Sequence, residues 1–300
     1  MKSFITLTFI STTLFFNNVN AMDSAISACN QAVEKGDATA ALSLSSKVLS
    51  KNKNDKDALI CQGRALSAQG DLNGAVTSFK AATEQSNDVF DKTIASILMG
   101  NAYKTAKQYD QAIASYQQSL AFAQSDKNQK FERISQNLIG DAYFSDKKLE
   151  QALAAYVSAN KLSANDNERG ESFENIALMH HHLNQHDLAL EYQIKAYLTH
   201  EKVGTLDQYA HSSIELGRYY TFTKNYLSAE STLNKIIKFA KEQGGAYYEA
   251  QGSYLLAKVK VATGDVESAK TLVQNAKLIA KNTNDSALEQ EINQETQSMF

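Results

Sequence analysis

Four histidines near the middle of the sequence have the residue type and spacing that metal chemistry requires. They are His180, His181, His182 and His186. Two imidazoles four residues apart on one helix can share a Zn²⁺ or Ni²⁺ ion, and His182 and His186 have this spacing. However, the helix that carries the first three is predicted to end near Leu183, and no Asp, Glu or Cys in a fixed register completes a ligand set. We therefore predict no metal site in this cluster.

The two cysteines, Cys29 and Cys61, could form a disulfide, because an even number of cysteines is compatible with one if the chain is exported, as the composition of residues 1–21 indicates below. They lie on neighbouring predicted helices that would pack side by side. Cys61 is two residues away from the position equivalent to Cys29, so the two side chains are expected to point in different directions. A disulfide needs Cα atoms within about 7 Å. Two separate buried thiols are therefore favoured, and the disulfide is the alternative.

Motifs of the common enzyme classes are absent from the sequence. It has no Gly-rich phosphate-binding loop, no GxSxG, no HExxH and no paired-cysteine metal motif. The formal net charge of −3 also leaves no basic excess for binding nucleic acid. We therefore expect neither an enzyme nor a nucleic-acid-binding protein, and no cofactor.

Residues 1–21 have the composition of a targeting segment. Lys2 gives a short positive start, residues 4–16 are mostly apolar, and Val19-Asn20-Ala21 offers compact residues at a cleavage site. The apolar run is shorter than the about 20 residues of a transmembrane helix. We expect cleavage after Ala21, a periplasmic or secreted location and no membrane insertion after cleavage. An uncleaved membrane anchor is the alternative.

The elements that would position any site are helices in a repeating pattern. The sequence contains no Pro, and its apolar residues recur three and four positions apart. Residues 96–123 predict two antiparallel helices, which can cross closely only if a small residue lies at each crossing point. Gly100 and Ala112 fit those two points. The large residues around this crossing are Tyr103, Tyr109 and Tyr116.

The same pattern recurs along the chain. Its small crossing residues, spaced by 37 or 40 positions, are Gly63, Gly100, Gly140, Ala177, Gly217 and Ala257. Polar linkers rich in Asn, Asp, Ser, Gly and Lys separate the repeats. We predict seven helical pairs over residues 22–282. Residues 283–300 are predicted to form a polar capping helix or tail, because Leu288 and Ile292 are its one apolar pair.

This pattern resembles the tetratricopeptide repeat, in which a small residue, an aromatic three positions later, an Ala and a second aromatic recur. The usual period of that repeat is 34 residues, so the helices here are expected to be about one turn longer. The resemblance implies an all-α fold, a right-handed α-solenoid of antiparallel helix pairs. It also implies that the first helix of each pair lines a concave groove, and that His180 occupies a buried aromatic position.

The resemblance assigns the groove residues. They are Arg64, Asn101, Lys104, Asp141, Phe144, His181, His182, Arg218, Phe222, Tyr254 and Lys258. Charges of both signs with exposed aromatics suit an extended peptide or a partner helix, and Phe144, Phe222 and Tyr254 are the expected anchors. The function implied is an exported scaffold that binds a peptide or protein partner, in an assembly or adaptor role. The alternative is a peptide-ligand sensor that signals to a membrane partner.

Overall fold

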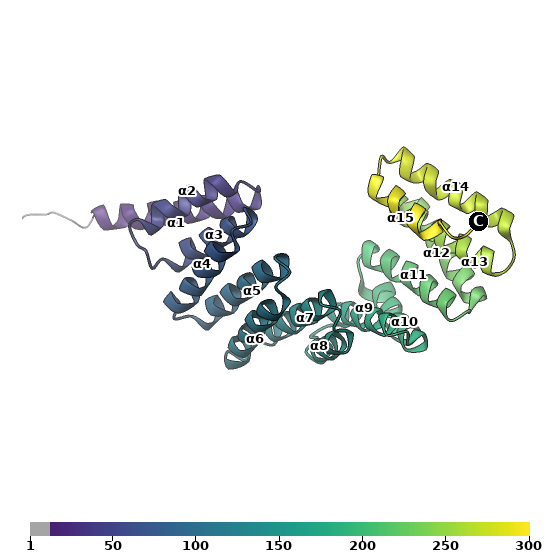
Figure 1. The fold of residues 1–300 in the computed structure, drawn as a ribbon, viewed down its shortest axis with the longest axis horizontal. Helices are drawn as coiled ribbons and strands as arrows, with labels where there is room; N and C mark the ends of the chain where they lie inside the picture. Colours follow the sequence, from purple (N-terminus) through teal and green to yellow (C-terminus); the bar gives the residue numbers. More distant parts are fainter. Residues whose placement is uncertain (1–12) are drawn as a thin grey trace, which may run out of the picture. The chain divides into compact units, whose positions relative to one another are not determined.

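The computed structural model describes residues 13–300, with side chains from residue 23 onward, as helices joined by short turns (Figure 1). The chain divides into two compact units, residues 1–146 and 147–300, which are described separately. The helices of the first unit are α1 (Thr13–Glu34), α2 (Ala38–Leu49), α3 (Lys56–Ala68), α4 (Leu72–Gln85), α5 (Val89–Thr105), α6 (Tyr109–Ser125) and α7 (Gln129–Ser145). Those of the second unit are α8 (Leu149–Lys161), α9 (Asp166–His182), α10 (His186–Val203), α11 (Leu206–Phe222), α12 (Tyr226–Gln243), α13 (Ala246–Ala262), α14 (Val266–Asn282) and α15 (Ser286–Thr296). The described residues contain no strand, and the predicted all-α repeat fold of antiparallel helix pairs is confirmed.

Polar residues in the predicted linkers fix where the helices begin. The side chains of Asp37, Asp55 and Asp71 each accept a hydrogen bond of 2.9 Å from the backbone N–H three residues later. At the start of α11, Thr205 and Gln208 cap one another reciprocally. Such caps satisfy N–H groups that have no partner within the helix. They fix the N-terminal ends of these helices in a chain that has no Pro to mark the helix boundaries.

Small residues lie where the helices of a pair cross, as predicted. Gly100 and Ala112 are both buried, and a Cβ atom added to Gly100 would collide with the ring of Tyr116. The same arrangement holds at Gly63, where an added Cβ would lie 2.5 Å from the ring of Phe79. Because real Cβ atoms do not approach so closely, the glycine is required by the packing of its own pair.

The core of the second unit continues into the last helix. Ile214 from α11, Leu233 from α12 and Tyr254 from α13 belong to one buried cluster, which Leu288 and Ile292 of α15 complete. Helix α15 packs against both α13 and α14. The apolar pair of the predicted capping helix is thus the pair that anchors it.

Cys29 and Cys61 form a disulfide, so the expectation of two separate thiols is wrong. The bond joins α1 to α3, with Cα atoms 6.3 Å apart and both residues fully buried. The two-residue offset is what lets them meet. Two residues turn a side chain by about 200° around a helix, so the two cysteines lie on facing sides of adjacent helices.

The predicted targeting segment, residues 1–21, lies entirely outside the residues whose side chains the structure describes, and residues 1–12 lie outside the described backbone as well. Helix α1 extends from Thr13 to Glu34 and so runs through the expected cleavage point after Ala21. Among the described residues, no helix combines the length and apolar character that a membrane span requires.

Candidate partner-binding site

The predicted groove residues divide between the two units. Arg64 lies on α3, Asn101 and Lys104 lie on α5, and Asp141 and Phe144 lie on α7. The second unit holds the other six, which are His181, His182, Arg218, Phe222, Tyr254 and Lys258. All of them lie on the first helix of a pair, and each unit presents its own candidate site.

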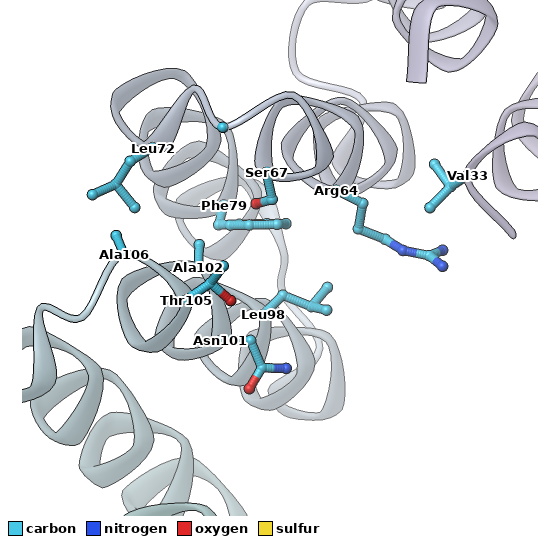
Figure 2. A pocket seen from close by; sticks show the side chains of 11 residues that line it. Val33, Arg64, Ser67, Leu72, Phe79, Leu98, Asn101, Ala102, Thr105 and Ala106 are labelled. Carbon is cyan, nitrogen blue, oxygen red and sulfur yellow. The ribbon is translucent and has the colours of Figure 1, made fainter. Parts of the chain in front are cut away.

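In the first unit, α3 and α5 enclose a pocket of about 380 Å³ (Figure 2). We call it the α3/α5 pocket. Leu72, Phe79 and Leu98 supply apolar walls, and Figure 2 shows the flat ring of Phe79 lying between α3 and Leu98. Its size is at the small end of the range for ligand sites, and it suits the side chain of a bound peptide.

Two predicted groove residues, Arg64 and Asn101, line this pocket. The guanidinium of Arg64 extends toward Val33 of α1 and donates a 3.0 Å hydrogen bond to Asn30 Oδ1 (Figure 2). Asn101 Oδ1 accepts a 2.7 Å hydrogen bond from the hydroxyl of Tyr116. Each side chain is therefore held in place by a neighbouring helix while it remains partly accessible to solvent.

The remaining predicted residues of the first unit lie further along. Lys104 Nζ is 3.5 Å from Asp141 Oδ2, and both side chains are about one-third or more exposed. Such an exposed pair contributes at most about 1 kcal/mol to stability. Phe144 is half-buried on α7.

In the second unit, a polar pocket of about 440 Å³ contains His181, His182 and Arg218. Glu174 and Glu215 also line it, so its wall mixes imidazole, guanidinium and carboxylate groups. Burial raises the pKa of Glu174 to about 7, although nearby His211 and Ser212 act in the opposite direction. Burial, then the neighbouring imidazoles of His186 and His182, then Arg218 lower the pKa of His181 to about 4.

The rings of the histidine cluster contact one another and Phe222, mostly in tilted arrangements. The Nδ1 atoms of His181 and His186 are 3.3 Å apart, and both rings contact Phe222, with centroid distances of 4.5 and 5.4 Å. His180 instead stacks on Tyr192 at 5.4 Å and is half-buried. Within the described part of the chain, no three His, Cys, Asp or Glu side chains are placed to hold a metal ion. Phe222 remains 45% exposed, so its ring is available to a partner.

Tyr254 is fully buried, so the prediction that it is an exposed groove anchor is wrong. The reason is α15, which covers this part of α13. The hydroxyl of Tyr254 donates a 2.6 Å hydrogen bond to Glu291 Oε1, and Lys258 forms an ion pair with Glu295. Arg218 NH1 is 3.7 Å from the same Glu295 carboxylate.

Sequence reasoning missed Glu291 and Glu295 as partners of the predicted groove residues. A signal for them was present, because they follow Tyr254 and Lys258 by 37 residues, one of the repeat spacings. Helix α15 thus has the position of a first helix in an eighth repeat. Its inward positions carry carboxylates.

Replacing Glu174 with Gln is expected to change how stability depends on pH. The pKa of Glu174 in the folded chain, about 7, exceeds its ordinary value of 4.5. The folded chain therefore binds a proton at Glu174 more tightly than the unfolded chain does. The resulting stabilisation of the fold is fully present below pH 4.5 and is lost as the pH rises through 7. From pH 4 to pH 8, the free energy of unfolding of Glu174→Gln should gain about 3 kcal/mol relative to wild type.

Urea unfolding of both proteins across this pH range measures the change. His181 acts in the opposite sense, because its lowered pKa makes the chain less stable as the pH falls from 6.5 toward 4. The stability of the wild type can therefore change little with pH. The test is the difference in free energy of unfolding between the variant and the wild type at each pH. A difference that stays constant across the range would contradict the prediction.

Two segments of the chain match family models described as "Tetratricopeptide repeat". They are residues 95–126, which cover most of α5 and α6, and residues 168–242, which cover most of α9 to α12. No curated protein sequence matches the chain.

Solved structures with the same fold include three helical-repeat proteins. The apo form of RapI has a TM-score of 0.70 and 13% identity, over 93% of this chain and 82% of that one. A signal transduction ATPase with a tetratricopeptide repeat sensor, from Pyrococcus horikoshii, has a TM-score of 0.72 and 17% identity, over 90% of this chain and 44% of that one. A putative kinesin light chain from Podosopora anserina has a TM-score of 0.57 and 16% identity, over 67% of this chain and 100% of that one.

At these identities the similarity concerns the fold alone. The segments that match the family models coincide with three of the helix pairs, and Gly100 and Gly217 are the crossing residues of two of them. With the helix pairs, their crossing glycines and the family matches in agreement, this chain contains tetratricopeptide repeats over residues 95–126 and 168–242.

Proposed function

We propose that this protein is an exported scaffold that binds a segment of a protein partner through the first-helix faces of its repeats. The α3/α5 pocket is the observation that carries the proposal. An apolar cavity beside a fixed guanidinium suits a peptide with one apolar side chain in the pocket. A carboxylate or backbone carbonyl of the same peptide would then accept a hydrogen bond from Arg64.

The disulfide supports the exported location. Disulfides persist in oxidising compartments and are rare in the cytosol. The Cys29–Cys61 bond and the composition of residues 1–21 therefore favour the same compartment, the periplasm or the exterior of the cell. Mass spectrometry of the exported protein identifies its N-terminal residue and so tests cleavage after Ala21. Met22 supports cleavage, and intact Met1 in the membrane fraction would support the anchor.

Filling the α3/α5 pocket is expected to weaken peptide binding. Thr105 is exposed and lines the pocket, so Thr105→Phe places a ring where the apolar side chain of the peptide would lie. We expect the affinity for a peptide selected on the wild-type protein from a random display library to fall at least tenfold, as for the loss of a buried anchor. Fluorescence anisotropy with the labelled peptide measures the change.

A matched control is available in the same unit. Thr77 is exposed on α4, the second helix of its pair, and it does not line the pocket. Thr77→Phe should therefore leave the affinity unchanged. Equal binding by wild type, Thr105→Phe and Thr77→Phe would show that selected peptides use another surface. Solution scattering with the same peptide tests the sensor alternative, because a change in compactness on binding would favour it.

A further inference from the structure

The last helix, α15, carries two carboxylates. Hydrogen-bond donors and cations on one face of the second unit surround them. Glu291 and Glu295 lie four residues apart on α15, so they project from the same side of that helix. Oε1 of Glu291 accepts hydrogen bonds from the hydroxyl of Tyr254 at 2.6 Å and from Nε2 of Gln251 at 2.7 Å. The hydroxyl of Tyr247 donates to Oε2 of the same carboxylate at 3.3 Å.

The second carboxylate is held by cations. Lys258 forms an ion pair with Glu295, and Arg218 NH1 approaches Oε2 of the same group at 3.7 Å. The Arg218 side chain is only 19% exposed, and Glu215 and the hydroxyl of Tyr254 fix its position. Four residues of α13 and one of α11 form this surface, which we call the α13 face. They are Tyr247, Gln251, Tyr254 and Lys258 of α13 and Arg218 of α11.

The apolar attachment of α15 is small by comparison. Its buried side chains are Leu288, Ile292 and Thr296, and just the first two belong to the core cluster of this unit. A turn of three residues, 283–285, joins α15 to α14. Removal of α15 from the face rearranges that turn and detaches Met299 from the cluster of Ala257, Ala269 and Val273. It would uncover an apolar strip bordered by five donors.

We propose that the α13 face is a docking site for an acidic amphipathic helix of a partner protein, and that α15 occupies this site as an internal ligand. The helix that fits carries Leu and Ile four residues apart and Glu three residues after each of them, as Leu288, Glu291, Ile292 and Glu295 do. The apolar pair provides contact area, and the carboxylate pair sets register and orientation against the two cations. This site is separate from the α3/α5 pocket, so each proposal can fail without the other.

The test uses the full-length chain and a labelled synthetic peptide of residues 284–300 as the probe. In Leu288→Ser/Ile292→Ser, the internal helix loses its apolar attachment while the α13 face keeps all five donors. We expect this variant to bind the peptide at least tenfold more tightly than wild type, because the internal competitor is weakened. A peptide with Glu291→Gln and Glu295→Gln should bind at least tenfold more weakly than the unmodified peptide. Arg218→Gln in the same variant chain should have a similar effect.

Several outcomes of these measurements would overturn the proposal. A variant that keeps its helical circular dichroism and melting transition but fails to bind the peptide would show that α15 is a fixed cap. So would equal binding of the charged and uncharged peptides. If the double variant does not fold, the full chain with Glu291→Gln/Glu295→Gln keeps the apolar attachment, and it must bind the unmodified peptide more tightly than wild type. A wild-type dimer in sedimentation that Leu288→Ser/Ile292→Ser abolishes would make a second copy the occupant and overturn the assignment to a partner.

Discussion

Loss of the Cys29–Cys61 disulfide is expected to lower the free energy of unfolding of the first unit by about 2–4 kcal/mol. The bond joins residues 32 positions apart, so it restricts a substantial loop of the unfolded chain. The surrounding core is small, since the buried residues around the two cysteines are Ala32, Ala41 and Ala65. Alanines bury little apolar area, and the covalent bond therefore provides a large share of the stability here.

Urea unfolding with and without a thiol reductant measures this contribution. The double variant Cys29→Ala/Cys61→Ala is the control, because it keeps small buried side chains but cannot form the bond. It should match the reduced wild type approximately and should not respond to reductant. If the oxidised wild type and the double variant were equally stable, the disulfide would form as a consequence of folding and would not contribute to the free energy of unfolding.

The substitution Gly63→Leu is expected to cost about 3 kcal/mol or to prevent the first unit from folding. A Cβ atom at this position would lie 2.5 to 2.8 Å from three ring carbons of Phe79. That ring is 1% exposed, so the added side chain must displace it from its packing at the crossing of α3 and α4. Thermal and urea unfolding of the purified variant, followed by circular dichroism at 222 nm, provide the measurement.

Ala68→Leu is the matched control for this prediction. Ala68 is exposed and lies five residues further along the same helix, α3. The same side chain added there should change stability by no more than about 0.5 kcal/mol. Helix propensity favours Leu over Gly and is nearly equal for Leu and Ala, so it predicts no loss at either position. Similar losses at the two positions would therefore mean that the crossing with α4 does not determine the effect.

The repeats could be predicted from the sequence because their main requirement is local. A closely crossing pair needs a small residue at the crossing and a large one beside it, and Gly100 with Tyr116 shows this within 16 positions. Residue type and spacing are enough to locate such a pair. The same rule placed Arg64 and Asn101 on first helices, where the structure brings them together at one pocket.

Contacts between neighbouring repeats were harder to predict, because they depend on which sides of two helices face each other. The two-residue offset between Cys29 and Cys61 predicts side chains that point apart, but on adjacent helices those opposite sides face each other and the bond forms. The sequence pattern predicts an exposed Tyr254, because in that pattern α13 is the first helix of the last pair. Helix α15 continues the array by one more helix, and its carboxylate at Glu291 removes that hydroxyl from solvent.

The disulfide also bears on how the first unit opens. In a stack of repeats the end element has one neighbour, so it normally frays first and its amide protons exchange fastest. Here α1 is bonded to α3 through Cys29 and Cys61, and the two helices cannot separate independently. We therefore expect the amides around Cys29 to exchange in one cooperative step with those around Cys61. Reduction of the bond should then return α1 to the fast, independent exchange of a terminal helix.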